Sequence, residues 1–239
     1  MRILITGGAS GLGEAITTKL ASNPDNFVFF TYCRSLEKAS LLEKKFSNVK
    51  ALHVDFTNPE SLNNLLITMS SINLEVLINN ALSVNNVLHF HKIKANDISN
   101  SFMSNVLPVI TIKQRAVELF RKSKFGKIIT VLSSAIINKP PIGWSTYVAE
   151  KNYLLSISKS IAVENATFNI TSNCVSPSFM LTNLNSSIDE RIVEEMIVKH
   201  PLKNILTTNE TADAVLFLVG ASQHINGINM VINSGSDIV

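Results

Sequence analysis

Two side chains near the middle of the chain have the types and the spacing for proton transfer. Tyr147 and Lys151 lie four positions apart in the stretch "STYVAEKNY". A helix would bring both side chains to one face. A free phenol has a pKa of about 10, and a nearby ammonium favours its ionised form. The two residues are either a proton-transfer pair or an ordinary exposed helix pair, and this stretch alone does not decide between them.

A glycine-rich turn near the N-terminus indicates a site for a phosphate-bearing ligand. The sequence "TGGASGLG" covers residues 6–13, at the end of an apolar run. Glycines let the backbone turn tightly and approach a pyrophosphate, while the following helix offers free N–H groups and the positive end of its dipole. The cofactor contacts expected from this turn are Gly7, Ser10, Gly11, Leu12 and Gly13.

The end of the second apolar run bears on the nucleotide. It consists of Cys33, Arg34 and Ser35, with no acidic residue before Glu37. An acidic residue here would bind the ribose hydroxyl of NAD, whereas an arginine can pair with the 2′-phosphate of NADP. Arg34 either binds this phosphate or points into water. We expect NADP(H) to be favoured over NAD(H), with contacts from Arg34 and Ser35.

Asp55 and Phe56 follow the third apolar run and are further candidates for cofactor contact. The Asp55 carboxylate would accept a hydrogen bond from the adenine amine, or it would cap the helix that begins near Asn58. The residues leave both alternatives open.

Apolar, β-rich runs alternate with helical patterns along the whole chain. The strand candidates are residues 2–6, 27–32, 49–54, 75–79, 126–133, 169–176 and 229–233. The helix candidates are residues 12–22, 35–46, 58–70, 96–121, 145–166 and 208–220. Most strand candidates are near-continuous apolar runs, which is typical of parallel strands buried on both faces. We therefore predict an α/β fold: one Rossmann-type, doubly wound parallel sheet of about seven strands with helices on both faces, in a single domain over residues 1–239.

Composition narrows the function classes. With 46% apolar residues, the chain is globular and not disordered. No apolar run reaches the roughly 18 residues of a membrane span, and the opening "MRILITGG" leaves no room for a signal peptide, so we expect a cytoplasmic protein without a membrane partner. A net charge of +3, spread along the chain, does not indicate nucleic-acid binding. The five histidines lack metal-ligand spacing, and no metal is expected.

Together, these motifs resemble those of the short-chain dehydrogenase/reductase family from residue 2 to about residue 235. "TGGASGLG" matches the family's TGxxxGxG turn, and "YVAEK" matches its YxxxK. The family has a serine thirteen positions before the tyrosine, here Ser134, and an asparagine in its fourth long helix, here Asn105. Its NNAG motif is "NNAL" here, and Pro177 and Thr182 match the segment after its sixth strand.

The resemblance implies an oxidoreductase that interconverts a carbonyl and a secondary alcohol by hydride transfer to or from NADP(H), on a small-molecule substrate. In that reading Tyr147 gives or takes the proton. Lys151 lowers the pKa of the phenol and binds the nicotinamide ribose, Ser134 steadies the substrate oxygen, and Asn105 holds a water on the proton path. The remaining implied cofactor contacts are Asn79, Asn80, Ala81, Pro177, Met180 and Thr182.

The resemblance also bears on substrate, assembly and local geometry. The compact chain looks like the 3-oxoacyl-carrier-protein reductase branch, with residues 179–200 as a short lid over the substrate. Trp144, Phe179 and Met180 would line an apolar wall of the substrate site or pack in the core. A homodimer or homotetramer is implied through the two longest helix candidates, whose extra apolar residues include Val106, Ile110, Leu154 and Ile161. Pro108 lacks an N–H, which predicts a helix distortion beside Asn105.

Two departures from the family pattern keep a second function open. Leu82 and Ser178 stand where the family usually has glycine. A side chain at either position would alter a loop angle or crowd the nicotinamide side. The alternative function is a nucleotide-binding regulatory or scaffold protein of the same fold with weak or no turnover.

Overall fold

Seven parallel strands form one sheet. The computed structural model describes residues 1–83, 87–182 and 189–236. The strands are β1 (Arg2–Ile5), β2 (Phe27–Tyr32), β3 (Val49–His53), β4 (Val76–Asn79), β5 (Gly126–Val131), β6 (Ile170–Pro177) and β7 (Asn229–Ile232). They lie in the order β3-β2-β1-β4-β5-β6-β7, and each neighbouring pair is parallel. The predicted doubly wound sheet is confirmed, and the strand order changes direction between β1 and β4, where a ligand crevice is expected.

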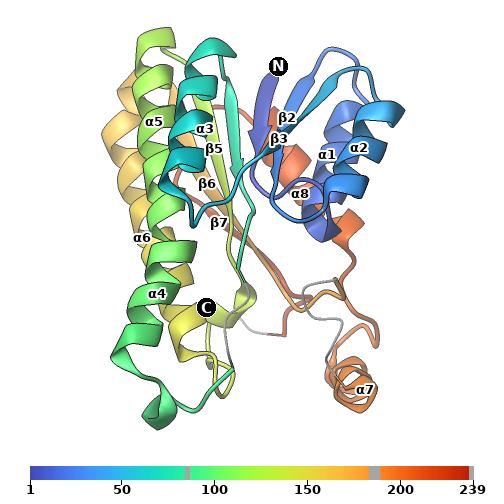
Figure 1. Ribbon diagram of the computed structural model, residues 1–239. Helices are drawn as coiled ribbons and strands as arrows, with labels where there is room; N and C mark the ends of the chain where they lie inside the picture. Colours follow the sequence, from blue (N-terminus) through green and yellow to red (C-terminus); the bar gives the residue numbers. More distant parts are fainter. Residues whose placement is uncertain (84–86, 183–188, 237–239) are drawn as a thin grey trace.

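Helices cover both faces of the sheet (Figure 1). One face carries α1 (Gly11–Ala21), α2 (Leu36–Lys45) and α8 (Thr208–Gly220). The other face carries α3 (Pro59–Ser71), α5 (Leu107–Ser123) and α6 (Ser145–Asn165). α4 (Ala95–Asn105) lies next to the start of α5, beyond the sheet, and packs against α5 and α6. Short 3-10 turns occur at Phe90–Lys92, Ser134–Ile136 and Ala166–Phe168. Among the described helices, none combines the length and the apolar character that crossing a membrane requires.

The core has one apolar layer on each side of the sheet because successive strand residues point to opposite faces. In β1, Ile3 and Ile5 pack into the layer that holds α1 and α8. Leu4 points the other way and packs with Met69 of α3 and Phe120 of α5. This two-sided burial explains why the strands read as near-continuous apolar runs in the sequence.

The long helix predicted over residues 96–121 is in fact two helices. α4 ends at Asn105, α5 begins at Leu107, and Val106 between them has φ −105° and ψ −52°. Pro108 lies in the first turn of α5, where its missing N–H costs least. The predicted distortion beside Asn105 is confirmed, but it is a complete helix boundary, which fixes Asn105 at a helix C-terminus.

Two of the apolar residues that suggested a subunit interface are buried in the core of the chain itself. Val106 and Leu154 are 0% and 4% exposed, and both belong to one buried apolar cluster. Their apolar character therefore needs no partner subunit. Met103 on α4 and Val163 on α6 are 57% and 82% exposed. Assembly through these helices stays a prediction.

The predicted lid, residues 179–200, is described only in part, since residues 183–188 lie outside the described residues. Its second half contains α7 (Glu190–Lys199), where every residue is at least partly exposed. In Figure 1, α7 stands apart from the two helix layers, near the carboxyl ends of the strands. The lid role stays a prediction.

Packing at the start of β5 gives a test of the fold. A Cβ atom at Gly126 would lie 2.1 Å from ring carbons of Phe120, which is fully buried. We expect Gly126→Ala to lower the free energy of unfolding by about 1–3 kcal/mol, the usual cost of overpacking a core. Gly220→Ala is the control because a Cβ there meets nothing within 4 Å. Urea unfolding followed by circular dichroism measures both, and equal midpoints would contradict the packing of Phe120 on β5.

Candidate active site

The glycine turn after β1 is closed so tightly that side chains do not fit. Gly7 and Gly11 have φ values of +67° and +54°, a region that favours glycine. A Cβ at Gly13 would lie 1.9 Å from the carbonyl oxygen of Gly7. Glycine at these positions lets the backbone adopt this turn and leaves no side chain between it and a ligand.

The helix that follows this turn begins without a side-chain cap from Ser10. α1 begins at Gly11, and within the described residues the Ser10 side chain caps none of its N–H groups. Leu12 and Gly13 belong to this first turn, and Thr182 lies beside it, 3.5 Å from the position of a Cβ on Gly11. A helix N-terminus next to a glycine backbone suits the pyrophosphate of a dinucleotide.

Thr6 ties the glycine turn to the segment after β4, a role that the sequence reasoning missed. Its hydroxyl oxygen accepts hydrogen bonds from the N–H groups of Asn80 and Ala81, at 2.9 and 3.0 Å. The Asn80 amide in turn donates to the carbonyls of Thr6 and Gly7, at 3.1 Å each. The only signal for this role in the sequence is the threonine that opens the TGxxxGxG pattern. Asn80 thus fixes the turn, and Ala81 packs directly against Gly7.

The ends of β2 and β3 present charged groups to solvent. Arg34 is exposed, and Ser35 precedes α2 without capping it by its side chain, as far as the described residues show. Asp55 accepts hydrogen bonds from the hydroxyl and the N–H of Thr57, and these bonds, with the nearby charges of His53 and Arg34, lower the pKa of Asp55.

The capping alternative for Asp55 is wrong. Asn58 caps α3, because its side chain accepts hydrogen bonds from the N–H groups of Glu60 and Ser61. The Asp55 carboxylate is occupied by Thr57 instead. Phe56 lies between Asp55 and this cap and is half-buried.

Lys151 is buried beneath the end of β5. Its side chain projects from α6 and its ammonium donates to the carbonyl oxygen of Val131 at 2.9 Å. The Nζ atom lies 5.7 Å from the centre of the Tyr147 ring. Burial lowers the pKa of Lys151 to about 8, although the charges of Glu150 and Cys174 act in the opposite direction.

The pKa of Tyr147 is raised, which corrects the expectation that Lys151 would lower it. Burial is the largest cause, and the negative charge of Glu150 adds to it, while a hydrogen bond with Ser133 opposes both. The Lys151 ammonium donates to the Val131 carbonyl, and its charge is not among the causes that set the pKa of Tyr147. The phenol is therefore held in its protonated form. The ring of Trp144 packs edge-on against it, with 5.2 Å between ring centres.

Ser133 and Ser134 are placed differently by the turn after β5. Ser133 shares a hydrogen bond with the Tyr147 phenol, and its oxygen also accepts the N–H of Ala135 at 3.2 Å. Ser134, the serine selected from the sequence, is the next residue and begins a 3-10 turn. The structure thus brings Ser133 to the tyrosine.

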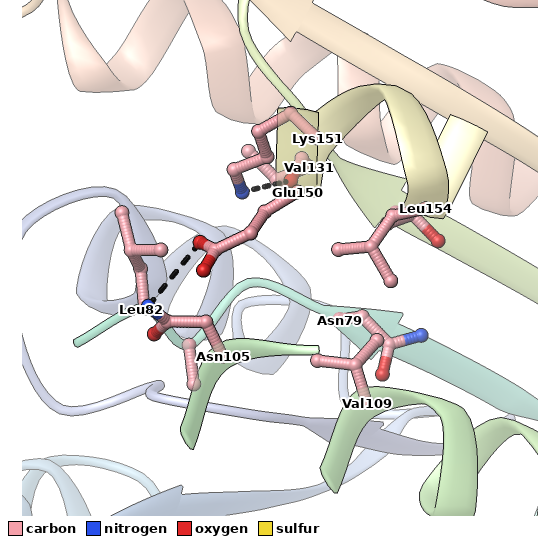
Figure 2. A pocket seen from close by; sticks show the side chains of 10 residues that line it. Asn79, Leu82, Asn105, Val109, Val131, Glu150, Lys151 and Leu154 are labelled. Carbon is pink, nitrogen blue, oxygen red and sulfur yellow. Dashed lines mark hydrogen bonds between the residues drawn. The ribbon is translucent and has the colours of Figure 1, made fainter. Parts of the chain in front are cut away.

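Asn105 lies at the centre of a buried polar cluster between α4 and α6. It is 6% exposed, and its side-chain oxygen accepts the N–H of Ser83 at 2.9 Å. Its amide nitrogen donates to the Ser101 hydroxyl at 3.3 Å and to Glu150 Oε2 at 3.4 Å. The Ser101 hydroxyl donates to Glu150 Oε1 at 2.5 Å. Sequence reasoning missed Glu150, which points from α6 toward Asn105 (Figure 2).

A small cavity lies between these groups. Its lining residues are Asn79, Ala81, Leu82, Asn105, Val109, Thr130, Val131, Glu150, Lys151 and Leu154. The volume open to the centre of a water molecule is about 10 Å³, which suits about one water. Both polar atoms of the Asn79 side chain and the Thr130 hydroxyl are buried without a hydrogen-bond partner among the described residues.

The two departures from the family pattern are accommodated by the backbone. Leu82 lines the cavity, and Ser178 donates its N–H to the carbonyl of Ile232 at 2.8 Å, after Pro177 ends β6. Neither of these two described residues has a positive φ, so neither position requires glycine for its conformation.

Met180 accepts a hydrogen bond from the Thr211 hydroxyl at 3.0 Å and packs against the core.

Comparison with known proteins places this geometry in a family. A family model described as short chain dehydrogenase matches residues 1–192. A 3-oxoacyl-[acyl-carrier-protein] reductase of Buchnera aphidicola is 28% identical, and the match covers 97% of this chain and 95% of the relative. The Staphylococcus aureus protein of the same name is also 28% identical, over 97% and 96% of the two chains.

Solved structures share the fold. A short chain dehydrogenase from Burkholderia cenocepacia in complex with NADP is 25% identical, with a TM-score of 0.86 over 98% of this chain and 97% of that chain. The protein ElxO with NADP bound has a TM-score of 0.88 at 24% identity, over 98% of both chains. The chain therefore belongs to the short-chain dehydrogenase family, on the side of its 3-oxoacyl-reductase-like members, and is an NAD(P)-dependent oxidoreductase acting on CH–OH and C=O groups.

Proposed function

We propose that the protein reduces a ketone to a secondary alcohol with NADPH, and that Tyr147 supplies the proton. The observation that carries this proposal is the meeting of Tyr147, Ser133 and Lys151 at the end of β5. The nicotinamide supplies the hydride, so the protein must deliver one proton to the substrate oxygen.

The Tyr147 phenol carries the proton that the reductive direction requires. Burial raises its pKa and makes it a weaker acid, so proton transfer at neutral pH needs groups that stabilise the phenolate. Ser133 is hydrogen-bonded to the Tyr147 phenol. Its hydroxyl can bind the same substrate oxygen and stabilise the negative charge that develops there. The Lys151 ammonium, 5.7 Å from the centre of the Tyr147 ring, carries a positive charge that would favour the phenolate left behind.

The substrate proposed is a 3-oxoacyl thioester or a related small ketone. The support comes from the relatives named as 3-oxoacyl-carrier-protein reductases, which match nearly the whole chain. The packing of Trp144 on Tyr147 adds an apolar surface beside the reacting oxygen. The comparisons give no support to the alternative of an inactive scaffold protein.

Replacement of the proton donor tests the function. We expect Tyr147→Phe to lower kcat by about 10²- to 10⁴-fold, the usual contribution of a positioned acid, while leaving NADPH affinity close to wild type. The assay follows NADPH consumption with a panel of ketones that includes a 3-oxoacyl thioester. Tyr153→Phe, on the same helix but exposed and packed edge-on against Phe102, is the control. Near-normal turnover by Tyr147→Phe would refute the role of this tyrosine.

The two adjacent serines give a second test. Because Ser133 is the residue that hydrogen-bonds Tyr147, we expect Ser133→Ala to lower kcat by about 10²-fold, as loss of a donor to a developing oxyanion does. Ser134→Ala should keep most of its activity and serves as the matched variant. Steady-state kinetics of both variants decide the assignment. The reverse order of effects would restore Ser134 as the substrate-binding serine.

We propose further that NADP(H) is preferred over NAD(H). Arg34 is the exposed cation at the end of β2, and Ser35 with the start of α2 lies next to it. A charge-assisted pair with the 2′-phosphate contributes about 1.5–3 kcal/mol. This corresponds to about a ten- to hundredfold preference.

Titration with both nucleotides tests this preference. Arg34→Ala should weaken NADPH binding and leave NADH binding nearly unchanged, and Cys33→Asp should shift the preference toward NADH. Lys44→Ala removes an equal charge from the far end of α2 and controls for long-range electrostatics. Equal or tighter binding of NADH by the wild-type protein would contradict a phosphate contact by Arg34.

A further inference from the structure

Glu150 places a carboxyl group inside the protein, next to the proposed proton donor. It is 6% exposed and lies on α6, directly before Lys151 and one turn after Tyr147. Its two oxygens accept hydrogen bonds from Ser101 and Asn105, both on α4. Buried carboxyl groups are rare unless they are paired, and this one faces the charge of Lys151.

The cavity connects Glu150 to Lys151. Both residues line it, together with Asn79 and Thr130, whose buried polar atoms find no partner among the described side chains. A water in a cavity of this size would have the two to four polar partners that buried waters need. On its other side Glu150 accepts a hydrogen bond from Ser101, which is only half-buried and so has contact with solvent. Figure 2 shows the Glu150 carboxyl between Lys151 and Asn105.

We propose that Glu150 is a positioning residue that carries protons between Lys151 and solvent, by way of the cavity and Ser101. The proposal rests on the function proposed above. In the reductive direction the substrate oxygen takes the proton of Tyr147, and a proton from the Lys151 ammonium restores the phenol. The Glu150 carboxylate takes a proton from the Ser101 hydroxyl, which is replenished from solvent. Glu150 passes this proton to the cavity water, and the water delivers one to the Lys151 amine. Glu150 ends as a carboxylate again, so one proton enters for each alcohol formed.

Other titrating groups surround this path, and an experiment must distinguish their effects from those of Glu150. Lys113 on α5 and Cys174 on β6 face Lys151 from beneath, and burial lowers the pKa of Lys113 to about 8. Lys113 donates to the Ser158 hydroxyl at 2.8 Å. Because Lys113 and Lys151 titrate in one range, a pH profile of turnover cannot by itself identify Glu150. The titration of Tyr147 must therefore be measured directly.

The first experiment reads Tyr147 in the free protein. Isotope-labelled tyrosine gives one NMR signal for each of the three tyrosines, and Tyr147→Phe assigns the signal of Tyr147. Removal of the Glu150 charge favours the phenolate, so Glu150→Gln should move the titration of Tyr147 to lower pH. Glu164→Gln, an exposed position on the same helix, should leave it unchanged. An unshifted titration in Glu150→Gln would overturn the coupling.

The second experiment measures turnover at neutral pH. Glu150→Gln keeps a hydrogen-bond acceptor for Ser101 but cannot carry a proton, and kcat should fall by about ten- to a hundredfold with NADPH affinity unchanged. Formate should restore turnover to Glu150→Ala by occupying the vacated space, and formamide should not. An active wild-type enzyme with an equally active Glu150→Gln variant contradicts the relay alone. Wild-type protein without turnover on any ketone contradicts the proposed function, and the Tyr147 titration then still shows whether Glu150 and Tyr147 are coupled.

Discussion

The ammonium of Lys151 lies inside the protein, and an isolated charge there would be costly. The carbonyl of Val131 accepts one of its hydrogen bonds, and the nearby charge of Glu150 stabilises it further. Each compensating group depends on a further element. Val131 is the last residue of β5, so the strand must end there, and Glu150 is held by the last turn of α4. The helix boundary at Val106 in turn lets α4 end with Asn105 facing α6.

A second buried amine, that of Lys113, adds to the cost of holding positive charge inside the protein. The charge of Lys151 disfavours the charged form of Lys113, and burial is the largest cause that lowers the pKa of each lysine to about 8. The polar groups around them are drawn from three different helices, α4, α5 and α6. Packing of these helices on the sheet therefore sets the proton affinity of the site, and a change in helix packing would change it without touching a reacting group.

Much of the fold was predictable because its signals are local. Parallel strands buried on both faces appear as apolar runs, and each observed strand lies within two residues of its prediction. The boundary at Val106 was visible only as Pro108, because the apolar pattern continues through it. The choice between Ser133 and Ser134 depends on how one turn rotates two identical hydroxyls, which spacing alone does not encode. Glu150 had no sequence signal, since its burial comes from Ser101 and Asn105, more than 40 positions earlier in the chain.

Trp144 is the only tryptophan in the chain, and its ring rests edge-on against Tyr147. All of the protein's indole fluorescence therefore originates beside Tyr147. Ionisation of the neighbouring phenol, or a change in the polarity around it, alters the quenching of that emission. The protein thus carries an intrinsic optical probe next to this phenol, and its ionisation can be followed in unlabelled, unmodified material.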